Sequence, residues 1–176
     1  MRFTADFETT TNPNDCRVWA YAVASIEQPG FFKYGNSIDG FMCFCKDYSF
    51  EPDFVVYFHN LKFDGAFIFN WLFRNGFGYV KSRDELEKKT FTTLIDRNKT
   101  FYSIEVCFNR KGKNREKVVF YDSLKILPFS VAKIAKGFNL PLEKLEIDYE
   151  KERPVGHELT PHEVKYIEND VKIVAL

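Results

Sequence analysis

The first residues suited to chemistry are two acids near the N-terminus, Asp6 and Glu8. The stretch from Phe3 to Thr10 begins as an alternating β-strand, in which successive side chains point to opposite faces. Asp6 and Glu8 would therefore share one face. Neighbouring carboxylates repel each other unless a positive charge lies between them, and a divalent cation with hard oxygen ligands commonly provides it. The alternative is an edge strand whose acids face water, and these residues alone favour that alternative.

Two further acids occur in settings that favour a site. Asp64 follows the apolar run 54–58 and precedes a helix predicted over residues 66–75, where unsatisfied backbone amides favour a carboxylate. Asp170 lies on a predicted C-terminal helix, four residues after Tyr166 and on the same face. Phosphoryl-transfer sites hold two divalent cations roughly 3.5–4 Å apart. Four carboxylates from three elements could build such a site, although the 25 acidic residues offer many combinations.

The elements that must position these acids are predicted from periodicity and from turn and cap residues. The capping box from Thr160 to Glu163 predicts the start of the last helix. The near-continuous apolar run 54–58 indicates a strand covered on both faces, so the sequence predicts an α/β fold with a central sheet flanked by helices. Further strands are expected over 17–27, 31–34, 91–95, 101–108 and 118–121, and further helices from the N-cap Ser37 to about Cys45 and over 130–138.

The composition fits one domain without a strong charge bias. The chain has 176 residues, including 20 Phe, 9 Tyr and 2 Trp, which is enough for a substantial core. Lys and Arg total 25, equal to Asp and Glu at 25, so nucleic-acid binding would depend on local patches. No signal peptide and no apolar run of membrane-spanning length is present, so we expect a soluble intracellular protein with no membrane partner.

The cysteines do not have the spacing of a metal site. Cys16, Cys43, Cys45 and Cys107 lack the paired Cys-x-x-Cys clusters of structural zinc sites. We expect them to be buried free thiols in a reducing compartment.

Four polar segments have less specific patterns. His59, Asn60, Lys62, Phe63 and Phe67 alternate hydrogen-bonding groups with aromatic faces, as a platform for a single nucleic-acid strand requires. The alternative for Phe63 is an ordinary core position. The basic stretch 109–115 predicts a hairpin tip, most often a solvated turn and less often a phosphate contact. The charged stretch 84–89 predicts a solvated turn or helix, and 144–156 an ordered loop.

Several strings resemble known exonuclease motifs. Residues 6–9 (DFET), 60–64 (NLKFD) and 166–170 (YIEND) resemble the three motifs of the DEDD 3′–5′ exonucleases, in the form with tyrosine before the last aspartate. The strings DFETTT, DCRVWAY, YFHNLKFDGAF, YDSLK, LPF, KERPVG and YIENDV resemble the exonuclease domain of protein-primed family B DNA polymerases. The resemblance leaves only about residues 80–100 unmatched. It implies a ribonuclease H-like fold with a mixed central sheet, spanning residues 1–176 as one domain.

The resemblance also implies a role for each matching residue. Tyr166 matches the residue that orients the attacking water, and Lys144 matches a lysine that assists catalysis. The ligands of two divalent cations, Mg²⁺ or Mn²⁺, are matched by Asp6, Glu8, Asp64 and Asp170. The positions that hold single-stranded DNA are matched by Thr9, His59, Asn60, Phe63, Phe67, Ser123 and Leu124. The region that touches a priming terminal protein is matched by Ser123, Leu124 and Phe129.

The function implied is a two-metal-dependent 3′–5′ exonuclease that removes nucleotides from single-stranded DNA 3′ ends. It would be the proofreading domain of a phage polymerase, monomeric, in the cytoplasm of an infected bacterial host. The polymerase motifs of the palm are absent from these residues, so synthesis is not expected of this chain. Two alternatives remain open. One is a module that binds single strands or the terminal protein without cutting, which the complete ligand set argues against. The other is a free-standing nuclease that acts on short oligonucleotides. The last helix has no stop signal at Leu176, which suggests a fragment and argues against this alternative.

Overall fold

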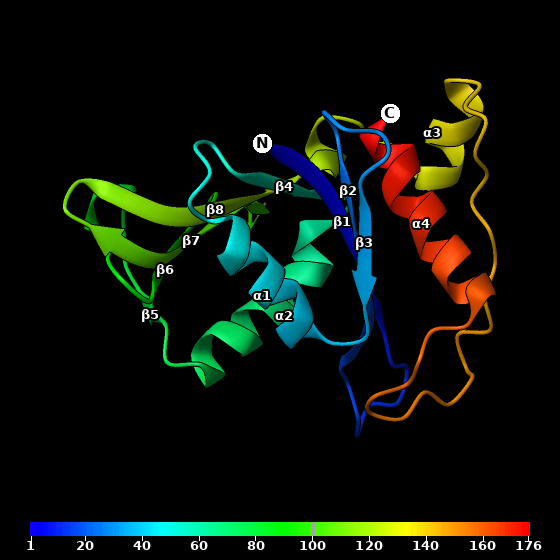
Figure 1. Cartoon of the computed structure of the whole chain (residues 1–176), viewed down its shortest axis with the longest axis horizontal. Helices are drawn as coiled ribbons and strands as arrows, with labels where there is room; N and C mark the ends of the chain where they lie inside the picture. Colours follow the sequence, from blue (N-terminus) through cyan, green and yellow to red (C-terminus); the bar gives the residue numbers. More distant parts are fainter. Residues whose placement is uncertain (100) are drawn as a thin grey trace.

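A mixed β-sheet forms the centre of the molecule (Figure 1). The computed structural model describes residues 1–99 and 101–176, and within them eight strands lie in the order β3-β2-β1-β4-β8-β7-β6-β5. β1 is antiparallel to β2 and parallel to β4, which is parallel to β8. This arrangement confirms the α/β prediction and the ribonuclease H-like sheet. The strands are β1 Arg2–Thr9, β2 Val18–Ser25, β3 Phe32–Gly35, β4 Val55–Phe58, β5 Gly78–Tyr79, β6 Thr90–Ile95, β7 Phe101–Lys111 and β8 Asn114–Asp122.

Helices cover both faces of this sheet (Figure 1). α1 (Ile38–Tyr48) and α2 (Leu61–Arg74) pack on one face, and α4 (Pro161–Ala175) packs on the other beside α3 (Val131–Gly137). Two short 3₁₀ helices, η1 (Arg83–Glu85) and η2 (Ser123–Lys125), lie in the connections. The sheet is therefore buried on both faces in its first half, as the apolar run before residue 59 predicts.

The two faces of β1 have different partners. Phe3, Ala5 and Phe7 belong to the core shared with α1 and α2. On the other face, Asp6 lies opposite Ala22 and Glu8 opposite Ala20 on β2. Because cross-strand partners share a face and alanine is small, α4 can pack close to the two carboxylates.

Aromatic packing fixes the position of the strand that carries the acids. The Phe7 ring makes edge-to-face contacts with Phe41 and Phe58, each with centroids 4.9 Å apart. Such contacts add to the hydrophobic effect of burial. A one-residue slip of β1 would move Phe7 out of this core and turn Asp6 and Glu8 to the wrong face, so the phenylalanines specify the register of the site.

The structure corrects the start of the second helix. α2 begins at Leu61 rather than at residue 66, after Asn60, which has a φ of 93°. Phe63 therefore lies in the first helical turn and not in a polar loop, and the predicted position of Asp64 at the start of a helix is confirmed. The predicted capping residues are confirmed, since Ser37 Oγ accepts from the Gly40 N–H at 3.2 Å and Thr160 forms the capping box with Glu163.

The basic stretch 109–115 is mostly strand, with the turn confined to Gly112 and Lys113. Arg115 donates to the carbonyl oxygens of Leu86 at 3.0 Å and Asp84 at 2.8 Å, and Arg110 pairs with Glu87. These two arginines attach the β7–β8 hairpin to the charged 83–87 segment. Their contacts favour a structural role over a phosphate contact.

The cysteine prediction is half right. Cys45 and Cys107 are buried, but Cys16 and Cys43 are exposed. Cys16 lies in the irregular connection before β2, and Cys43 faces outward on α1 because the buried stripe of that helix contains Met42, Phe44 and Cys45. None of the helices in the described part of the chain is long and apolar enough to cross a bilayer.

Candidate active site

Three acids from two elements converge on one face of the sheet. Asp6 and Glu8 come from β1 and Asp170 from α4, and one carboxylate oxygen of each lies within 4.8 Å of the others. The Glu8 and Asp170 residues are 8% and 4% exposed. Asp170 Oδ1 is buried and has no hydrogen-bond partner among the described residues. Three of the four predicted acids are thus brought together by α4 packing across β1 and β2.

Asp64 lies beside this group rather than within it. The group that meets the 4.8 Å limit does not include Asp64. Its side chain is buried in the first turn of α2, which follows β4, the parallel neighbour of β1. Burial raises its pKa, and the charges of Asp6 and Glu8 raise it further. All four predicted ligands therefore share one electrostatic environment at the carboxyl ends of two parallel strands.

The carboxylates shift one another's pKa values upward. Burial, and then the charge of Asp170, raise the pKa of Asp6 to about 7. Burial, and then the charge of Asp6, raise the pKa of Glu8 to about 8. Hard carboxylate oxygens in this arrangement, one of them buried and unpaired, fit a divalent cation such as Mg²⁺ or Mn²⁺. This donor set contains three of the four acids that the resemblance implies as metal ligands.

Lys144 and Tyr166 lie next to the acids. Lys144 Nζ pairs with Asp170 Oδ2 and lies 3.4 Å from the Tyr166 hydroxyl oxygen. Desolvation opposes the charge of Lys144, but the hydrogen bond and the charge of Asp170 raise its pKa overall. Burial, followed by the charge of Glu8, also raises the pKa of Tyr166, so its hydroxyl remains protonated at neutral pH. Tyr166 can therefore orient a group by hydrogen bonding but is unsuited to act as a base.

The sequence prediction missed Tyr149, which also reaches the site. Its hydroxyl oxygen lies 2.8 Å from that of Tyr166. Tyr149 follows a segment without helix or strand, so spacing gives no information about the direction of its side chain. An aromatic residue within a short loop after Lys144 was the only available signal.

Four of the residues expected to hold DNA follow the ends of β4 and β8, namely His59, Asn60, Ser123 and Leu124. His59 Nδ1 lies 3.0 Å from Ser123 Oγ, and His59 Nε2 lies 2.6 Å from the Phe129 carbonyl oxygen. Ser123 is buried and also donates to the Phe58 carbonyl oxygen at 3.2 Å, whereas the Phe129 side chain is exposed. The structure thus brings His59, Ser123 and Phe129 together.

Asp122 connects the segments that follow β4 and β8, and its role was not predicted from the sequence. Its Oδ1 accepts hydrogen bonds from the backbone N–H groups of Asn60 at 3.1 Å and Leu124 at 3.0 Å. A buried carboxylate therefore fixes the backbone at two predicted DNA-binding positions. An aspartate two residues before Leu124 is typical of a local side chain to backbone turn, and this signal could have identified it.

The two predicted aromatic residues of α2 differ in exposure. Phe63 is 53% exposed, so the alternative of a core position for it is wrong. Phe67 is partly buried and packs edge-to-face on Phe63, with centroids 5.8 Å apart. Thr9 lies half-buried at the end of β1, where the pairing with β2 shifts register after Glu8. An exposed phenylalanine held by a second ring can stack on a base.

The metal-free protein is expected to lose stability as the pH rises from about 4, near the ordinary pKa values of carboxyl groups, to about 8. The pKa values of Asp6 and Glu8, about 7 and about 8, exceed the ordinary 3.8 and 4.5. Their stabilising contribution is complete below the ordinary values and is lost as the pH passes through the folded-state values. Since cation binding requires ionised carboxylates, affinity should rise over the same range.

The melting temperature of chelator-treated protein, with and without Mg²⁺, measures both effects. Mg²⁺ should stabilise the protein more at the higher pH. Equal stabilisation by Mg²⁺ at the low and the high end of this pH range would contradict the assignment of Asp6 and Glu8 as metal ligands. Glu163, with its pKa lowered to about 2, affects stability only at more acid pH.

Known proteins resemble this chain in sequence. Residues 49–175 match the family model for DNA polymerase type B, organellar and viral. The DNA polymerase of Bacillus phage M2 is 52% identical over 173 residues, which are 98% of this chain and 29% of that protein. The DNA polymerase of Streptococcus phage Cp-1 is 32% identical over an alignment of 183 residues. This alignment again covers 98% of this chain and 29% of that protein.

A solved structure gives a similar result. Phi29 DNA polymerase complexed with single-stranded DNA superposes with a TM-score of 0.88 at 49% identity, covering 99% of this chain and 30% of that one. The phi29 enzyme complexed with primer-template DNA gives a TM-score of 0.89. The chain thus spans less than a third of the length of the relatives it matches.

Proposed function

The chain belongs to the type B DNA polymerases of organelles and viruses, and we propose that it is a metal-dependent 3′–5′ exonuclease acting on single-stranded DNA. The observation that carries the proposal is the cluster of the partly buried Asp6 and the buried Glu8 and Asp170, with an unpaired Asp170 oxygen facing no protein donor. Such a cluster destabilises a domain unless it has a ligand. In a polymerase, removal of 3′-terminal nucleotides serves proofreading.

The metal site would comprise Asp6, Glu8, Asp64 and Asp170. Divalent cations at such sites supply an activated water and stabilise the leaving oxygen in phosphoryl transfer. Tyr166, which keeps its proton, would orient the attacking water through its hydroxyl group. Lys144 would hold Asp170 Oδ2 in place and contribute positive charge beside the scissile phosphate.

The bound strand would approach from the ends of β4 and β8. Asn60, Leu124 and the exposed ring of Phe63 lie on this side. Asp122 fixes the backbone N–H groups of Asn60 and Leu124, and His59 contacts the Ser123 hydroxyl group. The phi29 polymerase structure with single-stranded DNA supports such a substrate, given the similarity of the two folds. We place the activity in the cytoplasm of an infected bacterium. The surface around Ser123, Leu124 and Phe129 would contact a priming terminal protein.

A cleavage assay tests the proposed function. A single-stranded oligonucleotide labelled at its 5′ end should shorten stepwise from the 3′ end when Mg²⁺ or Mn²⁺ is added, and chelator should stop the reaction. An oligonucleotide with a blocked 3′ end should resist. Tight binding without shortening would instead support a binding module.

Phe63→Ala is expected to weaken single-strand binding for every base composition. Stacking of a base on an aromatic ring contributes on the order of 1–3 kcal/mol, or about 5- to 150-fold in affinity. Because Phe63 is 53% exposed, the melting temperature should change little. Binding is measured by titration in Ca²⁺, a hard cation that occupies oxygen sites and usually does not support cleavage.

Phe50→Ala is the matched control for this experiment. Phe50 is 64% exposed and follows α1, before β4 begins, at the opposite end of the sheet from the acids. Its removal should leave DNA affinity unchanged. An affinity loss that is equal in both variants would rule out a specific stacking role for Phe63.

A further inference from the structure

An irregular segment delivers two polar groups to the candidate active site. Residues 143–153, here called the 143–153 segment, contain no helix or strand, yet Lys144 and Tyr149 reach Asp170 and Tyr166 from it. Without a backbone ladder, the position of this segment depends on side-chain bonds. Asn169 Nδ2 donates to the Glu143 carbonyl oxygen at 2.8 Å, near the beginning of the segment.

At its other end, the segment is anchored by a buried ion pair. Arg153 Nε donates to Glu163 Oε1 at 2.9 Å, and the two side chains are 3% and 4% exposed. The Arg153 guanidinium also stacks on Trp19 of β2, 4.1 Å from the ring centre. Arg153 therefore contacts both the sheet and the first turn of α4.

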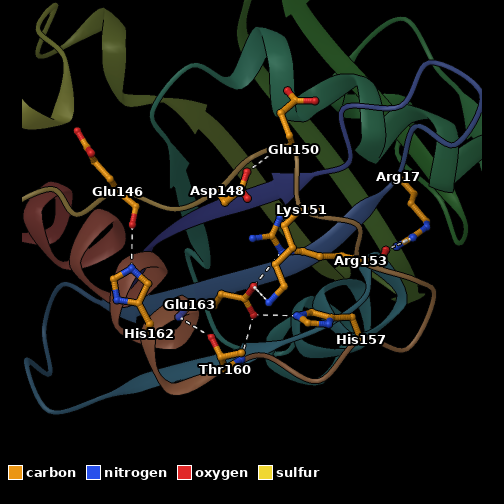
Figure 2. Close-up of polar contacts among 10 residues, drawn as sticks. All are labelled: Arg17, Glu146, Asp148, Glu150, Lys151, Arg153, His157, Thr160, His162 and Glu163. Carbon is orange, nitrogen blue, oxygen red and sulfur yellow. Dashed lines mark hydrogen bonds and ion pairs between the residues drawn. The ribbon is translucent and has the colours of Figure 1, made fainter.

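Glu163 is the centre of this network (Figure 2). Its Oε2 lies 2.8 Å from His157 Nε2 and accepts from the Thr160 N–H at 2.9 Å. These partners lower its pKa to about 2 although burial acts in the opposite direction, so Glu163 is ionised at neutral pH. Glu163 thus closes the capping box of α4 and holds Arg153 with the same carboxylate.

The network and the candidate active site share one helix face. Tyr166 and Asp170 follow Glu163 by three and seven residues, a spacing that places all three on one side of α4. Arg153 is four residues from Tyr149 along the 143–153 segment. A shift of the Arg153–Glu163 pair would therefore move Tyr149 and Lys144 relative to Tyr166 and Asp170.

We propose that Arg153 and Glu163 are positioning residues for the exonuclease reaction, an inference that depends on the proposed function. Their ion pair fixes the 143–153 segment on α4, and so fixes the Lys144 ammonium and the Tyr149 hydroxyl beside Asp170 and Tyr166. Neither residue touches the acid cluster. The residues proposed to bind DNA through β4, β8 and α2 do not depend on this pair.

The test uses Arg153→Lys and Glu163→Gln, which keep most of the buried volume. Lysine cannot reproduce the planar, stacked guanidinium contact, and glutamine removes the charge that holds it. Because small misplacements of catalytic groups are costly, each variant should lower the single-turnover cleavage rate at saturating DNA by about 10- to 100-fold. DNA affinity in Ca²⁺ should stay unchanged.

A double-mutant cycle distinguishes positioning from general stabilisation. If Arg153 acts through Tyr149, Arg153→Lys should slow cleavage less in a Tyr149→Phe background than in the wild type. Glu168→Gln is the control, because Glu168 pairs with Lys165 and Lys172 on the same helix away from the site. Its cleavage rate should equal that of the wild type. Full activity of folded Arg153→Lys and Glu163→Gln would overturn the inference.

Hydrogen exchange provides a readout that is independent of cleavage. Arg153→Lys should accelerate backbone exchange in residues 143–150, and Glu168→Gln should not. Wild-type protein that fails to cut DNA would refute the proposed function. Unchanged hydrogen exchange of this segment in Arg153→Lys would refute only the positioning role.

Discussion

Asp170→Ala is expected to reduce DNA cleavage to background while the protein remains folded. Asp170 supplies the buried oxygen without a protein partner, and it is the member of the acid cluster that comes from α4. Loss of Asp170 would weaken the binding of cations, whereas loss of an acid–base group would affect a single proton transfer. The rate should therefore fall by more than the about 10²–10⁴-fold that a single acid–base group contributes.

The same substitution should not destabilise the metal-free protein through electrostatics. Asp170 raises the pKa values of Asp6 and Glu8, so its removal relieves repulsion among buried acids. Lys144, whose side chain is 33% exposed, can turn toward solvent when its partner is removed. The melting temperature without metal should be retained, and the increase caused by Mg²⁺ should be lost.

Two variants complete this experiment. Asp170→Asn keeps the shape and an acceptor oxygen for Lys144 but removes the charge, and should be nearly as inactive. Glu168→Gln, two residues away on an outer face, should retain wild-type cleavage and Mg²⁺ stabilisation. Cleavage near the wild-type rate in folded Asp170→Ala would remove the basis of the metal-site assignment.

The sequence predicted the parts of the site that regular elements carry. Alternation along β1 placed Asp6 and Glu8 on one face, and the capping box fixed the phase of α4, which turns Tyr166 and Asp170 inward. The start of α2 was wrong by five residues because Asn60, not a residue near 65, adopts the left-handed conformation that precedes the helix. Local capping chemistry at that position was not evident from spacing.

The parts that the sequence did not reveal depend on contacts between distant segments. Tyr149 and Arg153 lie in a stretch without periodicity, and their roles appear only once α4 and Trp19 are placed beside them. Asp122 acts through backbone N–H groups, which carry no residue-specific signal at Asn60. Side-chain bonds to irregular backbone are therefore the features that sequence patterns predict least well.

Tyr166→Phe is expected to slow cleavage by about 10²–10⁴-fold, less than the loss of an aspartate. The substitution removes one hydroxyl group and keeps the ring, which is 2% exposed and packs with Ile167 and Val171. It also removes the bond to Tyr149 and leaves that hydroxyl without its partner at 2.8 Å. The acids remain, so Mg²⁺ should still raise the melting temperature.

The pH dependence of this variant identifies how Tyr166 acts. Because its pKa is raised, Tyr166 keeps its proton throughout the neutral range, and Tyr166→Phe should lower the rate by the same factor at about pH 7 and about pH 9. A base would instead give a variant whose deficit grows as the pH rises. Tyr149→Phe is the matched control for the lost hydroxyl pair, and the double variant should be little slower than Tyr166→Phe if the two hydroxyls act as one unit. A fully additive loss would show that Tyr149 contributes independently of Tyr166, for example by contacting the DNA itself.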